Sequence, residues 1–186
     1  MKRIVAAALM VILLSGCAGK HAQLERAMAL RGKMLVRSCT FTAQITADYG
    51  DKLYEFTMDC QVGGQGNVQF TVSKPESISG VTGQISQSEG KLTFDNDRAV
   101  AFELLADGQL APVAAPWVLI RALRSGYLTS CAQEGEMLRV AIDDSYEEDA
   151  LHLDIWLDSQ DLPVRGEILW QGRRILSMKV ANFSFL

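Results

Sequence analysis

Several features that would assign this chain to a common functional class are missing from its sequence. Basic residues do not outnumber acidic ones: the net charge is -4 at pH 7, which gives no electrostatic basis for binding nucleic acid. Only two histidines are present, His21 and His152, and no Gly-x-Ser-x-Gly motif accompanies them, so the sequence favours a non-catalytic protein. The cysteines are not spaced as pairs of metal ligands, and no metal or cofactor is predicted.

The chain also lacks the marks of a multidomain or membrane-spanning protein. No tract of low complexity, no block of like charge and no repeat of 20 to 50 residues is visible. After the first residues, no apolar run approaches the roughly 20 residues that a spanning helix needs. The sequence therefore predicts one globular domain, long enough to bury a sizeable core.

The N-terminus has the layout of a secretory signal. Met1-Lys2-Arg3 is positively charged, residues 4–14 are apolar, and Leu14-Ser15-Gly16-Cys17 places a cysteine directly after two small residues. This tetrapeptide resembles the lipobox of bacterial lipoproteins, a resemblance that implies lipidation of Cys17 and cleavage before it. We therefore expect a signal peptide at residues 1–16 and a single domain at residues 17–186, with residues 17–22 as the tether. The mature chain would then be extracytoplasmic and anchored to a membrane by acyl chains.

From residue 20 onwards, the hydrophobic pattern predicts one short helix and then many short strands. Residues 20–31 are spaced for a helix with one apolar face, and Gly32 is expected to end it. Residues 35–47 and 54–62 alternate with a period of two around a turn at residues 48–51, which is typical of a hairpin with one buried face. Further strands are expected at residues 68–72, 80–86, 91–94, 99–105, 138–142, 151–157, 164–170 and 176–180.

A second helix interrupts these strands. Residues 115–126 combine Pro116 near the first turn, Gly126 past the end, and Trp117, Ile120 and Leu123 on one side. The acidic run at residues 143–149 is interpreted as a solvated hairpin turn. The fold class is therefore mainly β (α+β), with a large antiparallel sheet that is curved or closed.

The order of these elements resembles the LolA/LolB-like fold of lipoprotein carriers and their lipoprotein relatives. The resemblance is carried by Cys39-Thr40-Phe41-Thr42-Ala43, Phe70-Thr71-Val72-Ser73-Lys74-Pro75, Ser88-Glu89-Gly90-Lys91-Leu92-Thr93-Phe94, Ala115-Pro116-Trp117-Val118-Leu119-Ile120 and Leu162-Pro163-Val164. It implies a strongly curved antiparallel sheet that forms a half-open barrel, with an N-terminal helix and a mid-chain lid helix over an apolar cavity.

Three cysteines remain after Cys17, and the register of the first hairpin decides whether two of them pair. If Tyr49-Gly50 forms the turn, Cys39 faces Cys60 at a separation compatible with a disulfide. If Gly50-Asp51 forms the turn, Cys39 faces Val62 and no bridge is made. An oxidising compartment would permit the bond.

Two functions fit these features. The first is a membrane-anchored, non-catalytic protein that binds an acyl or lipid-like ligand in an apolar cavity. The second is a structural or regulatory lipoprotein of the envelope or spore, with a filled core, that acts through contacts with another protein. The candidate cavity residues are the aromatic and aliphatic side chains of the sheet and the second helix: Phe41, Phe56, Phe70, Phe94, Trp117, Ile120, Leu123 and Trp170.

Overall fold

The fold is that of a computed structural model, in which residues 21–86, 93–95, 104–108 and 110–186 are described. The signal peptide, the lipobox and Cys17 lie outside these residues. The described chain begins with a helix at residues 21–36, and a second helix, α2 (Ala115–Ser125), follows the short 3₁₀ helix η2 (Pro112–Ala114). Another 3₁₀ helix, η1 (Glu76–Ile78), follows the third strand. The strands are β1 (Cys39–Asp48), β2 (Leu53–Val62), β3 (Val68–Lys74), β4 (Thr82–Ile85), β5 (Thr93–Asp95), β6 (Tyr127–Glu134), β7 (Met137–Asp143), β8 (His152–Leu157), β9 (Pro163–Trp170) and β10 (Arg173–Phe185).

These strands form one antiparallel sheet in the order β5-β4-β3-β2-β1-β10-β9-β8-β7-β6. The last strand, β10, pairs with the first strand, β1, and so joins the two halves of the chain. Strands β5 and β6 lie at opposite ends of the sheet and do not pair with each other, which leaves the sheet open. The expectation of a curved antiparallel sheet forming a half-open barrel, with an N-terminal and a mid-chain helix, is confirmed.

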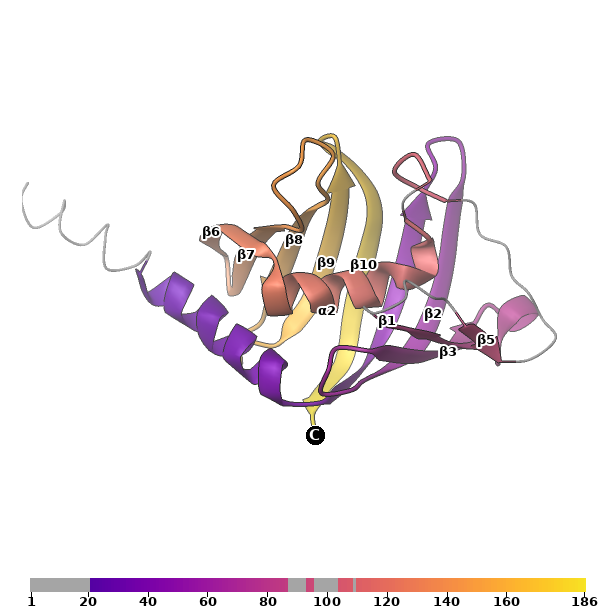
Figure 1. The fold of residues 1–186 in the computed structure, drawn as a ribbon, viewed down its shortest axis with the longest axis horizontal. Coiled ribbons are helices and arrows are strands. Elements are labelled where there is room, and N and C mark those ends of the chain that lie inside the picture. The colour runs from indigo at the N-terminus through magenta and orange to yellow at the C-terminus, as the bar shows by residue number, and fades with distance from the viewer. Residues whose placement is uncertain (1–20, 87–92, 96–103, 109) are drawn as a thin grey trace, which may run out of the picture.

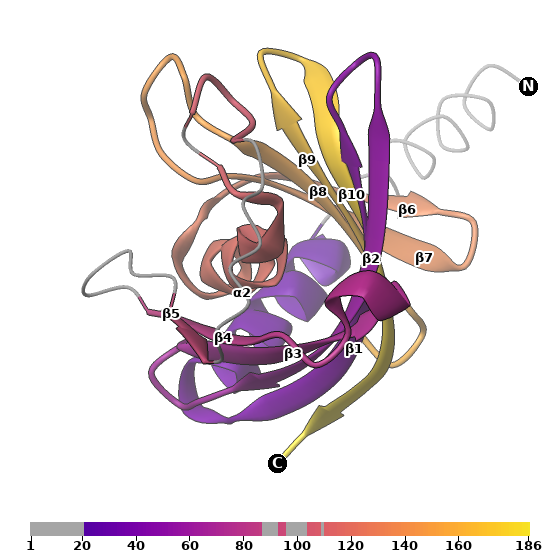
Figure 2. The ribbon, with the colours of Figure 1, turned by 90° about the vertical axis from the view of Figure 1, so that its right-hand side faces the viewer.

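Helix α2 lies across the concave face of the sheet (Figure 1), and the two halves of the sheet curve around it (Figure 2). Pro116 lies in its first turn, where the missing N–H leaves no helical hydrogen bond unmade. The helix ends at Gly126, whose N–H donates to the Ala122 carbonyl at 2.9 Å. The predicted helix at residues 115–126 is therefore confirmed.

The core lies between α2, the N-terminal helix and the concave face of the sheet. Alternate residues of β1, such as Ala43 and Ile45, are fully buried, as the period of two predicts. From the helices, Ile120 of α2 and Leu30 and Met34 of the N-terminal helix are 0% to 1% exposed. All of them belong to one continuous cluster of buried side chains.

The N-terminal helix is longer than the sequence predicts. It continues through Gly32 to residue 36. Leu30 and Met34, on either side of Gly32, both pack in the core, and this burial outweighs the cost of about 1 kcal/mol for glycine inside a helix. Residues 21–22, expected in the tether, are already helical.

One strand was not predicted from the sequence, and one predicted strand lies largely outside the described residues. Strand β6 was not expected, because most of its residues are exposed on both faces and no period of two appears. The strand expected at residues 99–105 falls largely outside the described residues. At its end, Leu105 and Leu110 exchange backbone hydrogen bonds of 2.8 and 3.0 Å as an isolated bridge.

The first hairpin adopts the register without a disulfide. Cys39 pairs with Val62, and Cys60 pairs with Phe41. Cys39 and Cys60 are both buried, free thiols, as expected for the alternative in which Cys39 faces Val62 and no bridge is made. Burial raises the pKa of the Cys39 thiol to about 11 and also raises the pKa of Cys60.

Candidate ligand-binding groove at the rim of the half barrel

Most of the predicted cavity residues fill the core and do not line a cavity beneath α2. Phe41, Phe70 and Phe56 also border grooves at the surface of the sheet. Phe41, Phe56 and Phe70 on the sheet are each 3% exposed, and Ile120 and Leu123 on α2 are 0% and 4% exposed. All five belong to the continuous core cluster. The other candidates lie elsewhere. Trp117 is half-buried, and the Cζ atom of Arg121 lies 4.8 Å from the centroid of the Trp117 ring. Trp170 is half-buried at the end of β9, and the side chain of Phe94 lies outside the described residues.

Three of the open grooves at the surface of the described chain stand out, and none of these three is lined by a residue of α2. The largest, of about 900 Å³, lies over the first four strands. Neutral polar side chains run across it in a row, because Thr40 pairs with Gln61, Gln61 with Gln69, and Gln69 with Gln84. Phe41, Cys60 and Phe70 also line this groove, but they are only 3% to 4% exposed, so they offer an apolar ligand little area to bury against.

A third groove, of about 390 Å³, has aliphatic side chains along one side. It lies at the rim of the half barrel, where the β1–β2 turn, residues 104–108 and the β9–β10 turn meet at one end of the sheet (Figure 1). We call it the rim groove. Its volume falls within the range of about 300 to 1,000 Å³ that is typical of small-molecule sites. Its lining residues are Asp48, Tyr49, Leu104, Leu105, Ala106, Asp107, Trp170, Gln171, Arg173 and Ile175.

Tight turns bring these distant segments together. Gln171 and Gly172 have φ angles of +49° and +75°, as the two central residues of a type I′ hairpin turn require, and Trp170 therefore pairs with Arg173. The Nη2 atom of Arg173 donates to the backbone oxygen of Asp48 at 3.1 Å and to its Oδ1 at 3.2 Å. These two contacts tie the β9–β10 turn to the β1–β2 turn.

One side of the rim groove is aliphatic and largely buried, and charged and amide side chains form the rest of its lining. Leu105, Ala106 and Ile175 are 3% to 6% exposed, whereas Leu104 at the edge is 54% exposed. A hydrocarbon chain in the rim groove would cover Leu104, and each methylene that it buries would contribute about 0.8 kcal/mol.

One polar atom in this wall has no partner. The indole Nε1 of Trp170 is buried, and no hydrogen-bond acceptor lies within reach of it among the described residues. Leaving such a donor unpaired costs about 1 to 3 kcal/mol. Because the Nε1 atom is itself buried, a carboxylate, ester or amide oxygen of a ligand could accept this hydrogen bond only after the side chains around Trp170 shift.

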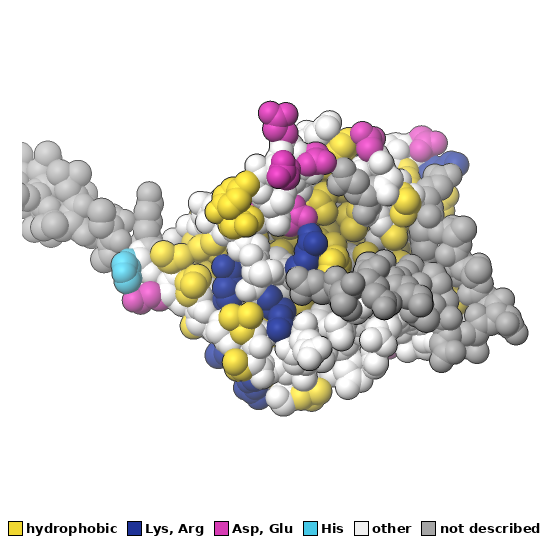
Figure 3. Space-filling view, in the orientation of Figure 1, with side chains coloured by type: hydrophobic (Ala, Val, Ile, Leu, Met, Phe, Trp, Pro, Cys, Tyr) yellow, Lys and Arg dark blue, Asp and Glu magenta, His cyan; other side chains and the backbone are white. Residues whose placement is uncertain are grey.

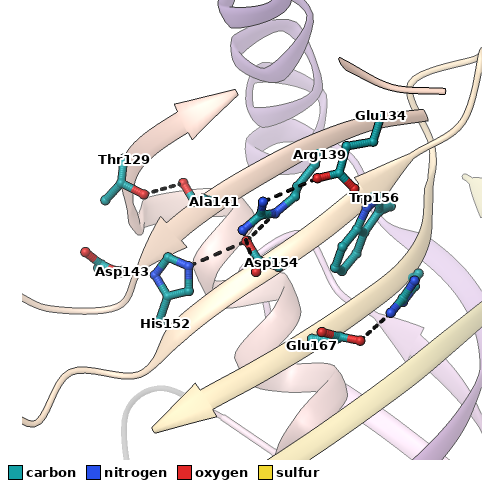
Figure 4. A network of polar contacts seen from close by, with 10 residues as sticks. Thr129, Glu134, Arg139, Ala141, Asp143, His152, Asp154, Trp156 and Glu167 are labelled. Atoms are coloured by element: carbon teal, nitrogen blue, oxygen red, sulfur yellow. Dashed lines mark hydrogen bonds and ion pairs between the residues drawn. The ribbon is translucent and has the colours of Figure 1, made fainter. Parts of the chain in front are cut away.

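The outer face of the other half of the sheet carries a network of charged side chains (Figure 4). Arg139 donates to both carboxylate oxygens of Asp154, at 2.8 and 2.9 Å, and these bonds raise its pKa. His152 lies 2.6 Å from Asp143 Oδ1 and 3.5 Å from Asp154 Oδ1. Trp156 donates its indole N–H to Glu134 at 2.8 Å.

The sequence analysis noted His152 only as one of two histidines and missed this network. The β7–β8 register pairs Asp143 with His152 and Ala141 with Asp154, so the hairpin itself brings these residues together. Thr129, the hydroxyl nearest this cluster in Figure 4, donates to the Ala141 carbonyl at 3.1 Å and not to His152. The arrangement is that of ion pairs that hold neighbouring strands together.

Two further observations concern classes of site. Among the described residues, no group of three or more His, Cys, Asp or Glu side chains could hold a metal ion. None of the described helices is both long enough and apolar enough to cross a bilayer.

Comparison with known proteins finds similarity at the level of structure. No protein-family model matches the sequence, and the search of curated proteins finds no match. Among solved structures, the chain is similar to an uncharacterized conserved protein from Thermus thermophilus, with 12% identity over 88% of this chain and 87% of that one and a TM-score of 0.45. It is also similar to a LolA superfamily protein from Nitrosomonas europaea, with 8% identity over 86% and 93% of the two chains and a TM-score of 0.38.

A third similar structure is a chain of the MucA/MucB complex of Pseudomonas aeruginosa. Identity is 17%, the match covers 88% of this chain and 56% of that one, and the TM-score is 0.38. The family that the sequence resembles is thus represented among the structural neighbours, through the LolA superfamily protein.

Proposed function

We propose that this chain is an extracytoplasmic protein, anchored to a membrane through a lipid on Cys17, that binds an acyl or lipid-like ligand without catalysis. The observation that carries the proposal is the rim groove, which combines an apolar wall with the unpaired indole N–H of Trp170. The ligand would lie along Leu104 and Leu105 and place a carbonyl or carboxylate oxygen against Trp170. This site replaces the cavity first expected between α2 and the sheet.

Native mass spectrometry on the chain from Ala18 to Leu186 tests for the ligand. This chain retains the whole described fold, because the buried core residues lie between Ala27 and Val180. We expect a mass excess that organic solvent removes and that is identified as lipid. A clean mass, together with no uptake of a fluorescent fatty acid, would contradict the proposal.

Replacing Trp170 with phenylalanine tests the groove itself. The change keeps the aromatic ring but removes the N–H, so we expect the affinity for a fluorescent fatty acid to fall about tenfold. Trp117→Phe is the matched control, because Trp117 is also half-buried but does not line the rim groove. Equal losses in the two variants, or a loss in Trp117→Phe alone, would point to α2 instead.

The anchor is tested separately with Cys17→Ser. We expect this variant to move from the membrane fraction to the soluble fraction, since it has no thiol to carry the diacylglycerol. The mass of the N-terminal peptide of the unaltered chain should exceed the peptide mass by that of the acyl groups. An unmodified peptide would contradict the lipid anchor on Cys17 but would not contradict ligand binding in the rim groove.

A second candidate function is favoured by the filled core. Ile120 and Leu123 of α2 are packed against the sheet, as expected for a structural or regulatory lipoprotein that acts on another envelope or spore protein through its surface. In that case the fatty acid is not taken up, and a partner is recovered after cross-linking in cells.

A further inference from the structure

The N-terminal helix leaves an apolar stripe uncovered on its outer side. Leu24, Met28 and Leu35 are 43%, 49% and 48% exposed. Together with Arg31 they recur at intervals of four, three and four residues, which places them in one row along the helix. The neighbouring row, Ala27, Leu30 and Met34, is the one that packs in the core. The exposed stripe is therefore a second apolar surface, which the fold itself does not need.

The stripe continues onto the start of β6. Arg31 donates from Nη2 to the Gly126 carbonyl at 2.7 Å and from Nε to the Leu123 carbonyl at 2.9 Å, which fixes the helix beside the end of α2. Tyr127, the residue after Gly126, is 40% exposed, and its ring lies tilted against that of Tyr146, with 3.7 Å between the ring centroids. Figure 3 shows hydrophobic and basic side chains mixed on this side of the molecule, above and along the N-terminal helix.

This composition fits the boundary between lipid headgroups and acyl chains. Tyrosine is enriched there because its ring is apolar and its hydroxyl is polar, and long basic side chains reach from apolar surface to the headgroups. The acidic residues Glu147, Glu148 and Asp149 follow Tyr146 in the sequence. The contact is therefore of limited area and depends on the apolar side chains more than on charge.

The position of the stripe in the chain identifies what covers it. Residues 17–20 lie between the proposed lipid anchor and the first described residue of the helix, and they span at most about 14 Å. A helix held so close to the bilayer by its N-terminus presents its uncovered stripe to the lipid at high effective concentration.

We propose that Leu24, Met28 and Leu35 of the N-terminal helix, with Tyr127 beside them, form a docking face that lies on the surface of the membrane to which the chain is anchored. The orientation of the domain relative to the bilayer rests on the anchoring in the proposed function, whereas the affinity of the docking face for lipid is a property of the domain alone. The docking face can therefore be tested without the anchor.

The experiment is flotation of the unlipidated chain, Ala18 to Leu186, with vesicles of phosphatidylcholine and phosphatidylethanolamine. We expect the unaltered chain to float with the vesicles, and we expect the double variant Leu24→Asp/Met28→Asp to lose at least about tenfold in partitioning, because two partly exposed apolar side chains no longer enter the lipid. Circular dichroism confirms that the variant is folded.

The matched control is Leu53→Asp/Leu186→Asp. Leu53 and Leu186 are 66% and 62% exposed and lie outside the docking face, so this variant should float like the unaltered chain. Equal loss in both variants, or no flotation of the unaltered chain, would overturn the docking face.

The competing occupant is a second copy of the chain. Sedimentation velocity distinguishes it: a dimer that dissociates in Leu24→Asp/Met28→Asp, without any flotation of the unaltered chain, overturns the membrane assignment. A failure of the docking face can be distinguished from a failure of the proposed function. Flotation measures the docking face, whereas fatty-acid binding by the Trp170→Phe variant tests the rim groove and fractionation of the Cys17→Ser variant tests the anchor.

Discussion

At the scale of single residues, packing can require glycine where the backbone does not. Gly126 has a φ of -68°, an angle that any residue adopts. A Cβ at this position would nevertheless lie 2.4 Å from Ile142 Cγ2 and 2.9 Å from the Ala122 carbonyl oxygen. The end of α2 therefore fits against β7 only without a side chain at residue 126.

This contact makes Gly126→Ala a destabilising change. We expect the free energy of unfolding to fall by about 1 to 3 kcal/mol, the usual range for overpacking a filled site. Gly32→Ala is the control: it lies inside a helix with no atom within 4 Å of the added Cβ, and it should raise stability by up to about 1 kcal/mol. Urea unfolding of both variants measures the difference. A Gly126→Ala chain as stable as the unaltered one would show that α2 can shift away from β7.

At the scale of the elements, the sequence correctly predicts the helices and strands that bury one face, because their apolar residues recur at a regular period. The alternation at residues 54–62 and the signals around Pro116 and Gly126 placed β2 and α2, because burial on one face repeats every two or 3.6 residues. Strand β6 could not be found in this way, since it has no buried face. Gly32 was misleading because its effect is local, whereas the burial of its neighbours is a tertiary effect.

Local periods in the sequence do not predict the pairing register of β1 and β2 or the residues that line the rim groove. Tyr49-Gly50 and Gly50-Asp51 both have turn chemistry, and the structure pairs Cys39 with Val62. The rim groove draws on three segments far apart in the sequence, and only Trp170 of the candidate residues lines it. No spacing rule could have joined that residue to Tyr49 and Leu104, because their proximity depends on the closure of β1 onto β10.

The filled core also changes how α2 can be used experimentally. The substitution Ile120→Asp would not serve as a test of ligand uptake. Because Ile120 is 0% exposed in the core, an aspartate there would bury an unpaired charge and disrupt the fold. Trp170 and Leu104 lie at the surface of the groove, where substitutions report on binding.

At the scale of the whole molecule, the two proposed surfaces lie apart. The turns that form the rim groove meet at one end of the sheet, and the N-terminal helix runs away from that end (Figure 1). A domain that rests on the membrane through this helix would keep the rim groove open to the aqueous phase. A ligand could then enter without release of the domain from the membrane.

The stability of the whole domain should fall at alkaline pH, because two core thiols must stay protonated. Burial, partly offset by Arg124, raises the pKa of Cys39 to about 11, and burial together with the charge of Asp59 raises the pKa of Cys60. Both folded-state values exceed the unfolded value of about 8.5. The stability that these thiols contribute is therefore complete below about pH 8.5 and is lost as the pH rises through the folded pKa values.

Urea unfolding from about pH 8 to about pH 10.5 measures this loss. We expect the free energy of unfolding to fall by up to about 1.4 kcal/mol per pH unit for each thiol above about pH 9. The variant Cys39→Ala/Cys60→Ala should be less stable at neutral pH, because it leaves small cavities, but its stability should depend less on pH. Since tyrosines and lysines titrate equally in both chains, the difference between the two slopes isolates the thiols. Parallel slopes would mean that the core opens enough to solvate Cys39 and Cys60 before they ionise.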